Sequence, residues 1–362
     1  MKEQKFKSET KGEIILEIDE YSLKLKIENN NFFANYGFLK EYDKKLTDVN
    51  PKLFELMIWL LLYNLDTIKF SEPYKIKKTN KHLVSYSGGA DSTALLSMFG
   101  GVPVHILRSY NKDYENRQIR ACNNVNSKNI ETDFELIRKF YLNKEGFNVG
   151  IGYAALYFPI LELLGLDTIY FGVVFDDLAF NYGQELKFNG DIKNSNFHRI
   201  NNHLKNYDIS IRFPLAGYSE VLTTKIADES KISNFSSCHT IGNEDSCGVC
   251  YKCFRKQGIR GKKISLKDKK TYGNITKILD KKPIKMASST IYAIQKVNYQ
   301  GNYFSKFYNV DVAWCDRVNK YYNDEFGIGH ISKYKFQTEH DLQMINQFVD
   351  FINNDKLYKW NY

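Results

Sequence analysis

The chain has 362 residues, of which 43% are hydrophobic, so it is long enough to bury a substantial core and to form about two domains. Lys and Arg number 51 and Asp and Glu 42, and the resulting charge of +9 is spread along the chain instead of forming one basic block. This excess suits an anionic ligand such as ATP, or a nucleic acid, but does not select between them.

No segment of the sequence predicts a membrane association. The longest apolar run, residues 53–65, contains Glu55 and Asn64 and is shorter than the ~20 residues that a membrane-spanning helix needs. The first residues lack the apolar core of a signal peptide. We therefore expect a cytoplasmic protein with no membrane partner.

Residues 1–80 predict a separate N-terminal segment of β-hairpin plus helix. Residues 12–28 alternate apolar and polar side chains in two runs, which is a hairpin pattern. Asn50 and Pro51 have the residue types of an N-cap and a first helical position, and they open the apolar run. We expect this segment to pack beside a domain formed by residues 81–255, with residues 256–362 as a mainly helical extension.

Residues 81–99 predict a strand, a tight loop and a helix, which is a layout that binds phosphate groups. The loop reads Ser87, Gly88, Gly89, Ala90, Asp91, Ser92. Glycines accept positive φ angles and carry no Cβ atom, so consecutive N–H groups can turn toward an anion at the positive end of the following helix. Ser87, Ser92 and Thr93 add hydroxyl donors, and Asp91 either braces the loop or helps to hold Mg²⁺.

Strands and helices then alternate, which predicts an α/β fold with a doubly wound parallel sheet. We expect strands at residues 102–107, 129–134 and 167–173, and a helix at 152–165 that breaks near Pro159. Arg108 follows the second strand and Gly172 ends the fourth, at the edge where α/β folds bind ligands. Asp176 and Asp177 lie at the same edge, where they bind Mg²⁺, a ribose or a polar substrate, or cap the next helix.

The rest of the chain predicts a loop or insertion, one strand and two helices. Residues 179–207 are polar and predict a long loop or insertion, followed by a strand at 209–215 and a helix capped by Ser219 or an earlier residue. The C-terminal part is aromatic and basic, with a helix expected at residues 339–352. Base stacking is compatible with Trp314, Tyr321, Tyr322 and Tyr334, but aromatic residues at helical spacing favour a core role.

Four of the six cysteines are clustered in a pattern that predicts a metal site. They are Cys238, Cys247, Cys250 and Cys253. Four thiolates complete a tetrahedral structural zinc site and leave no position for a reactive water. A [4Fe–4S] cluster is the main alternative, and His239 is an alternative ligand.

The Ser-Gly-Gly-x-Asp-Ser loop resembles the signature of the PP-loop ATP pyrophosphatases, which adenylate a substrate and release pyrophosphate. The loop, Pro214-Leu215, Ser237-Cys238 and the Cys-Gly-x-Cys-x-x-Cys run together resemble the 7-cyano-7-deazaguanine synthase branch over about half of the chain. Those enzymes activate 7-carboxy-7-deazaguanine with ATP, convert it with ammonia to an amide and then a nitrile, and carry a structural zinc.

The resemblance implies a role for each matching residue. It assigns ATP binding to Ser87, Gly88, Gly89, Asp91, Ser92, Thr93, Arg108 and Gly172, substrate binding to Asp176 and Asp177, and zinc binding to the four cysteines. Asp91 and Lys225 are the catalytic candidates, with Lys225 a looser match that would neutralise charge at the α-phosphate. The implied cofactors are ATP, Mg²⁺ and structural Zn²⁺, and the implied reactants are a small carboxylate and ammonia or an amine.

The sequence departs from that branch, so its substrate stays open. Ser109-Tyr110-Asn111 stands where the family has Tyr-Gly-Gln, and the tail after Cys253 is longer. Pro214-Leu215 followed by Cys-x-Lys-Cys also resembles the PP-loop domain of bacterial enzymes that epimerise glutamate in peptidoglycan precursors. Extended relatives occur in anti-phage systems, where conjugation to a protein or nucleic acid is an alternative.

Two further classes stay open. A tRNA-thiolating PP-loop enzyme would need a catalytic cysteine, for which Cys122 is the candidate in the nucleotide domain. A non-catalytic ATP-binding scaffold would use the flanking segments to bind a partner protein. A homodimer is compatible with either class, and nucleic-acid binding is not specifically indicated.

Overall fold

The structure is a computed structural model, and it describes residues 1–69, 71–108, 119, 122–180, 196–232, 235, 250–262, 286–298, 310–316, 343–344 and 347–348. The chain divides into two compact units. The first unit contains residues 1–87, 101–170 and 193–212, and the second contains residues 88–100, 171–192 and 213–362. Each unit is described separately below.

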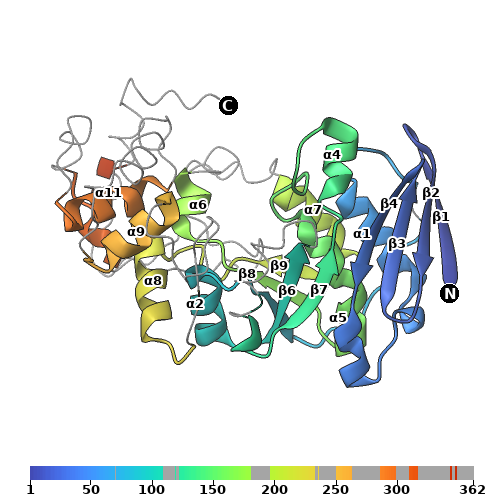
Figure 1. The fold of residues 1–362 in the computed structure, drawn as a ribbon, viewed down its shortest axis with the longest axis horizontal. Helices are drawn as coiled ribbons and strands as arrows, with labels where there is room; N and C mark the ends of the chain where they lie inside the picture. Colours follow the sequence, from blue (N-terminus) through green and yellow to red (C-terminus); the bar gives the residue numbers. More distant parts are fainter. Residues whose placement is uncertain are drawn as a thin grey trace. The chain divides into compact units, whose positions relative to one another are not determined.

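A nine-stranded mixed sheet is the main element of the first unit (Figure 1). Its strands are β1 (Lys2–Ser8), β2 (Gly12–Ile18), β3 (Ser22–Ile27), β4 (Asn30–Asn35), β5 (His82–Ser85), β6 (Val102–Arg108), β7 (Lys128–Thr132), β8 (Thr168–Phe171) and β9 (Ser210–Arg212). The spatial order is β1-β2-β3-β4-β7-β6-β5-β8-β9.

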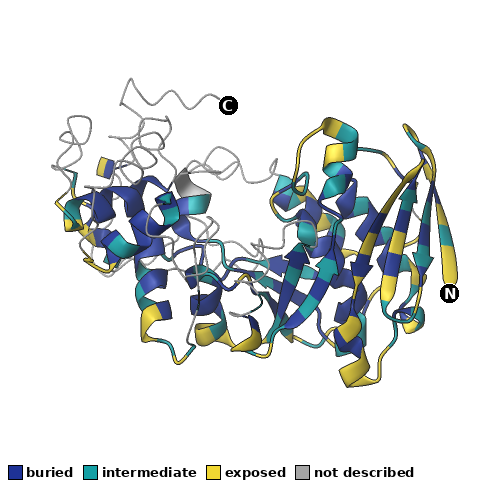
Figure 2. Ribbon diagram, in the orientation of Figure 1, coloured by how far each residue is buried: buried dark blue, intermediate teal, exposed yellow. Residues whose placement is uncertain are grey.

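Strands β1 to β4 form an antiparallel meander. The predicted hairpin is confirmed as β2 and β3, paired from Ile14 with Ile27 to Ile18 with Leu23. Their buried and exposed residues alternate, which Figure 2 shows as alternating colours along the strands. Strands β1 and β4 were not predicted, because their apolar residues are too few to stand out as a period-two pattern.

The meander continues into the α/β part of the sheet and is not a separate sheet. Strand β4 pairs with β7 through Ala34 with Thr132 and Asn35 with Glu131. The Thr132 hydroxyl also donates to the Phe33 carbonyl oxygen at 2.7 Å. The expectation of a small sheet packing beside the nucleotide domain is therefore corrected: residues 1–35 extend that domain's own sheet.

The remaining five strands have the order β7-β6-β5-β8-β9, with parallel pairing of β7 with β6, β6 with β5 and β8 with β9. If these five strands are numbered by their order in the chain, their order in the sheet is 3-2-1-4-5, as in doubly wound folds. The expected parallel sheet is thus found as half of a larger mixed sheet. The strand order reverses between β5 and β8, and such a reversal is where α/β folds place ligands.

The helical elements of the first unit are η1 (Gly37–Tyr42), η2 (Leu46–Asp48), α1 (Pro51–Leu61), α4 (Leu136–Leu142), η3 (Gly152–Tyr157), α5 (Phe158–Leu164) and α7 (Asn196–Lys205). Helix α1 has the predicted cap, since the Asn50 side chain accepts from the Lys52 N–H at 3.0 Å. The predicted break near Pro159 is the change from η3 to α5. The buried Tyr36 hydroxyl donates to the Leu156 carbonyl oxygen at 2.9 Å.

Helix α7 lies within residues 179–207, where the sequence predicts a long loop or an insertion. Its apolar residues Phe197, Ile200 and Leu204 are buried, with the spacing of one helix face. In the sequence, this apolar stripe is not evident because the residues between its members are polar. Residues 181–195 of the expected loop lie outside the described part of the chain.

The second unit contains α2 (Ala90–Phe99), α6 (Phe175–Phe180), α8 (Glu220–Glu229), α9 (Tyr251–Ile259), α11 (Ala287–Lys296) and η6 (Ala313–Asp316). Helices α9 and α11 pack so closely that a Cβ atom at Gly258 would lie 2.6 Å from the Ala293 Cβ atom. Trp314 is fully buried, with its ring 5.5 Å from that of Phe175 and 5.9 Å from that of Phe348. This confirms the core role of Trp314.

Two sequence predictions fall mostly on residues that are not described. In the stretch expected to form a helix at 339–352, the described residues Met344 and Phe348 are helical and buried. Tyr321, Tyr322 and Tyr334 lie outside the described residues. Among the helices that the structure describes, none has the length and apolarity to cross a membrane.

Candidate functional site

The glycine loop has the backbone that its sequence predicts. Gly88 has a φ angle of 72°, and Gly89 is the extended N-cap residue of α2. The Gly89 carbonyl oxygen accepts from the Thr93 N–H at 2.9 Å and from the Ser92 hydroxyl at 3.0 Å. A hydroxyl has a single proton to donate, so in this arrangement the Ser92 hydroxyl stabilises the loop and does not donate to a phosphate.

Gly172, which follows β8, lies directly against the first turn of α2. A Cβ atom at Gly172 would lie 3.0 Å from the Ser92 nitrogen and 3.1 Å from the Asp91 carbonyl carbon. These are backbone atoms and cannot rotate away. Gly172 therefore fixes the position of the Asp91 peptide.

Replacing Gly172 by alanine is expected to lower the free energy of unfolding by about 1–3 kcal/mol, because the added methyl group must displace the backbone of α2. Urea unfolding followed by circular dichroism would measure this loss. Gly165→Ala is the contrasting variant. An added Cβ atom there would meet nothing within 4 Å, so any loss of stability comes from the φ angle of +62° and not from a steric contact. An unchanged stability for Gly172→Ala would contradict the close approach.

The Asp91 carboxylate is held by side chains from α8 and α9. Its Oδ1 atom accepts from the Thr223 hydroxyl at 2.7 Å and lies 3.4 Å from the Lys256 ammonium nitrogen. Both partners use Oδ1, and no described residue donates to Oδ2. Asp91 is 27% exposed whereas Lys256 is 4% exposed, so the carboxylate has a buried cation on one side and an accessible edge on the other.

Glu220 is the centre of the charge cluster behind Asp91. Its carboxylate contacts the Arg255 guanidinium at 2.7 Å and the Lys256 ammonium at 3.0 Å, and accepts from the Ser289 hydroxyl at 2.8 Å. The two cations hold the pKa of Glu220 well below its usual range despite its burial. Lys256 also donates to the Thr224 hydroxyl at 2.8 Å. This cluster fixes the ammonium group beside Asp91.

Asp176 caps two helices, which is one of the roles that its sequence position predicts. One carboxylate oxygen accepts from the Glu220 N–H at 2.8 Å at the start of α8. The other accepts from the Ser289 N–H at 3.0 Å and from the Ser288 hydroxyl at the start of α11. Burial and the nearby charge of Glu220 raise the pKa of Asp176. Both oxygens of this fully buried carboxylate are occupied by the fold, and its role as a ligand of the substrate stays a prediction.

Asp177, the other predicted substrate ligand, lies in the first turn of α6 and is half-buried. Its N–H donates to the Val174 carbonyl oxygen at 3.0 Å. Its role as a ligand of the substrate stays a prediction.

Lys225 lies on α8 and is paired within the second unit. Its ammonium donates to the Asp316 carboxylate and lies 5.9 Å from the centre of the Tyr292 ring. The Tyr292 hydroxyl donates to the same carboxylate at 3.1 Å. Burial and the charge of Asp316 raise the pKa of Tyr292. The predicted catalytic lysine is therefore neutralised by a residue of the C-terminal extension in this structure.

The predicted zinc ligands are described only in part. Cys250 is the N-cap of α9, and its Sγ atom accepts from the Cys253 N–H at 3.4 Å. A thiolate at a helix N-terminus that accepts a backbone N–H suits a metal ligand, so these two residues fit a zinc site. Cys238 and Cys247 lie outside the described residues. Within the part of the chain that is described, no three His, Cys, Asp or Glu residues form a group that could hold a metal.

Cys122 and Cys315, the two cysteines outside the predicted metal site, are fully buried. Burial raises the pKa of the Cys122 thiol to about 12. Burial also raises the pKa of Cys315 well above its usual range. Neither thiol has the thiolate character that a nucleophile requires.

Two predicted ATP ligands, Ser87 and Arg108, belong to the first unit. Ser87 is exposed directly after β5. Arg108 ends β6, and its Nε atom lies 3.1 Å from the carboxylate of buried Glu135. The ATP-binding role of both residues stays a prediction.

The sequence reasoning missed the residues that hold Asp91. Thr223 and Thr224 follow Glu220 by three and four residues, which places them on one face of α8, and this spacing was the available signal. In the sequence, Lys256 is one of three basic residues beside the cysteines, with Lys252 and Arg255, and Asp316 has no distinguishing context. Nothing in the sequence indicated that these segments meet.

Comparison with known proteins gives limited matches. The model of a family of unknown function, DUF6395, matches residues 199–357. No curated protein matches. Among solved structures, the chain is similar to the U34-tRNA thiolase NcsA from Methanococcus maripaludis with its [4Fe-4S] cluster, at 13% sequence identity and a TM-score of 0.31. That match covers 72% of this chain and 84% of the other.

Proposed function

We propose that this protein is an ATP-dependent enzyme that forms AMP and pyrophosphate while it adenylates a small carboxylate. The observation that carries the proposal is the loop at the start of α2. It combines a positive φ angle at Gly88 with a part-exposed Asp91 that is held by Thr223 and Lys256. A glycine loop at a helix N-terminus suits phosphate groups, and the buried ammonium of Lys256 adds positive charge beside it.

In the proposed reaction, a carboxylate oxygen of the substrate attacks the α-phosphorus of ATP. The bond from that phosphorus to the oxygen bridging the α- and β-phosphates breaks, and pyrophosphate leaves. Ammonia or an amine then attacks the acyl carbon and displaces AMP. The N–H groups at the start of α2 stabilise the negative charge that develops on the departing pyrophosphate.

Asp91 is the residue that would hold Mg²⁺. Its Oδ2 atom accepts from no described residue, and its carboxylate is accessible, which fits the single protein carboxylate that Mg²⁺ bound to a nucleotide often uses. The ion would supply charge neutralisation of the phosphate oxygens. Lys256 lies on Oδ1, so it orients the carboxylate without occupying the other oxygen.

The substrate that the proposal names is a 7-carboxy-7-deazaguanine-like acid, with an amide, a nitrile or a conjugate as product. This part rests on the resemblance of the loop, the Pro-Leu pair and the cysteine run to 7-cyano-7-deazaguanine synthases. The buried, protonated Cys122 argues against thiolation through that residue. Amino acids, sugar acids and peptidoglycan precursors remain the alternative carboxylates.

The test is the stoichiometry of products from ATP, 7-carboxy-7-deazaguanine and ammonium, with each component omitted in turn. Chromatography would quantify AMP and ADP, and an enzyme-coupled assay would quantify pyrophosphate. We expect AMP and pyrophosphate in equal amounts only when the carboxylate is present. Formation of ADP and phosphate would contradict the proposal, and ATP binding without turnover would direct the search to the other carboxylates.

We also propose that Cys250 and Cys253 are ligands of a structural zinc ion, together with Cys238 and Cys247. The purified protein is expected to contain one zinc per chain and no iron, and to lack the visible absorption of an iron–sulfur cluster. Cys250→Ser and Cys253→Ser should each lose most of the zinc, whereas Cys122→Ser should keep it. Elemental analysis would decide, and iron with sulfide in the anaerobically purified protein would contradict the zinc assignment.

A further inference from the structure

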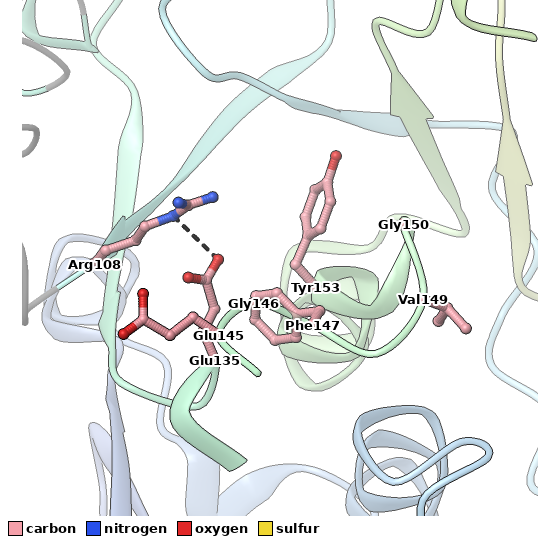
Figure 3. Close-up of a pocket in the computed structure, with 8 residues that line it drawn as sticks. All are labelled: Arg108, Glu135, Glu145, Gly146, Phe147, Val149, Gly150 and Tyr153. Atoms are coloured by element: carbon pink, nitrogen blue, oxygen red, sulfur yellow. Dashed lines mark ion pairs between the residues drawn. The ribbon is translucent and has the colours of Figure 1, made fainter. Parts of the chain in front are cut away.

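The charged residues at a cavity of the first unit are paired within the fold. The cavity has a volume of about 310 Å³ and lies where β6 ends (Figure 3). The dashed line in Figure 3 marks the ion pair of the Arg108 Nε atom with the Glu135 carboxylate, at 3.1 Å. The Glu145 carboxylate pairs with Lys139 at 3.1 Å. These four charges balance, and the excess positive charge of the first unit lies elsewhere.

Two short segments of the first unit, residues 75–81 and 196–208, carry a large excess of positive charge. Together they contain six Lys and Arg residues and one Asp, so they account for +5 of the net charge of +9. All six cationic residues are exposed. These six residues, which form the basic surface, are Lys75, Lys77, Lys78, Lys81, Arg199 and Lys205.

The two segments are far apart in the sequence but contact each other in the fold. The Ile76 N–H donates to the Tyr207 carbonyl oxygen at 3.1 Å. The Lys75 ammonium nitrogen lies 3.9 Å from the carboxylate of Asp208, which is the acidic residue of these segments. The basic surface is therefore a product of tertiary contacts, and the even spread of charge along the chain does not reveal it.

The backbone that carries the four lysines is held by the core of the unit. Residues 71–81 contain no helix, strand or turn, so this stretch of chain does not fold back on itself. The buried Asp167 carboxylate accepts from the N–H groups of Thr79 at 2.5 Å and Asn80 at 2.6 Å. Ile76, between exposed lysines, is only 3% exposed. The segment is thus anchored through these residues while its lysines remain in solvent.

Helix α7 adds a second row of hydrogen-bond donors to the basic surface. The helix contains no acidic residue. Arg199, Asn202 and Lys205 are exposed and lie three residues apart, which places them on one face. The opposite face is the apolar stripe that packs into the unit. The outer face of α7 therefore presents guanidinium, amide and ammonium groups.

The cations of the basic surface are poorly neutralised by the protein. Among the described residues, no carboxylate oxygen lies within 4.0 Å of the ammonium groups of Lys77, Lys78 or Lys81. The pair of Lys75 with Asp208 is long, and its side chains are 69% and 36% exposed, so it contributes little. The positive potential of this region is available to an anionic partner.

We propose that the basic surface binds the phosphate backbone of a nucleic acid. A series of Lys and Arg side chains along an anchored segment matches a chain of phosphates, and such contacts bind without reading the base sequence. A membrane is less well matched, because electrostatic attraction is only one of the two signals that stable anchoring needs. The exposed large apolar residues of the described chain lie outside both segments, at Met1, Phe33, Tyr42, Met98, Phe99 and Leu142. This proposal does not depend on the ATP reaction.

Fluorescence anisotropy of the full chain with labelled oligonucleotides of about 20 residues tests the proposal. The probes are a single-stranded RNA, a single-stranded DNA and an RNA duplex of mixed sequence, which distinguish the sources of the phosphate backbone. We expect at least one of them to bind, with an affinity that falls linearly with salt on a double-logarithmic plot. Absence of binding to all three at about 50 mM salt, or tighter binding to vesicles of phosphatidylserine and phosphatidylcholine, would overturn the proposal.

A triple variant locates the contacts. Replacing Lys77, Lys78 and Lys81 by glutamine removes three cations and leaves the anchoring residues in place. At about 0.1 M salt the affinity should fall at least about tenfold, and the slope of the salt plot should fall by about 2, because each lost contact with a single strand removes about 0.7. Thermal unfolding shows that the variant is folded. Normal binding by the folded variant would exclude these lysines from the interface.

The matched control removes the same charge from other exposed positions of the first unit. It replaces Lys7, Lys44 and Lys144 by glutamine. Because the net charge is the same as in the first triple variant, a loss that depends only on net charge would be equal in the two. We expect the control to bind within about threefold of the natural protein and to keep its salt slope. An equal loss in both triple variants would overturn the assignment to the basic surface.

Discussion

Replacing Glu220 by alanine is expected to lower the free energy of unfolding by about 3–5 kcal/mol, the cost of removing one partner from a buried ion cluster. Glu220 is 1% exposed, and Arg255 and Lys256 are 3% and 4% exposed. Without the carboxylate, two cations remain buried with too little negative charge around them. Urea unfolding monitored by circular dichroism would measure the loss.

Glu229→Ala is the matched control for this variant, because Glu229 lies on the same helix and is exposed. Its effect should stay within about 0.5 kcal/mol. The double variant Glu220→Leu with Arg255→Leu should recover part of the loss, since the pair is then removed together. A loss for Glu220→Ala as small as that for Glu229→Ala would contradict the cluster.

Glu220 also makes the free energy of unfolding depend on pH, in a direction that its lowered pKa determines. The pKa of Glu220 is depressed in the folded state, so its charge contributes full stability above its unfolded pKa of about 4.3. That contribution is lost as the pH falls from there through the depressed folded pKa. The stability difference between the natural protein and Glu220→Gln should therefore be constant near neutral pH and shrink below about pH 4.

Replacing Asp91 by asparagine is expected to reduce pyrophosphate formation by about 10²–10³-fold, the range seen when one preorganised electrostatic group is removed from an active site. The substitution keeps the size of the side chain and its hydrogen bond with Thr223, but it removes the charge that would hold Mg²⁺. Because the loop N–H groups remain, ATP binding should change much less than turnover. Turnover is measured as pyrophosphate release and binding by calorimetry.

Glu229→Gln is the control for the Asp91 variant and should keep full activity, since it removes an exposed carboxylate from α8. Lys256→Met distinguishes the contributions of the two partners of Asp91, because it removes the ammonium group and leaves the Thr223 hydroxyl in place. It should lower turnover as well as stability. An Asp91→Asn protein with normal turnover would exclude Asp91 from the reaction and leave the loop as a binding element.

Local features of this protein were determined by its sequence alone. The β2–β3 hairpin, the Asn50 and Ser219 caps, the break before Pro159 and the loop with positive φ at Gly88 follow from the types and spacing of neighbouring residues. Each depends on interactions over a few residues of chain, such as a side chain that accepts from an N–H two or three positions later. The sequence displays such patterns directly.

Only the tertiary structure decided which distant segments meet. Strand β4 pairs with β7 through two residue pairs, and the periodicity of neither strand predicts a partner about 100 residues away. The position of Asp176 after a buried strand left ligand and helix cap both open, and only the packing shows that the N-termini of α8 and α11 converge on its two oxygens. The position of Lys256 beside Asp91 likewise depends on how α8 and α9 pack. Burial and long-range charge pairing arise from that packing, so they set the roles of these residues where composition and spacing could not.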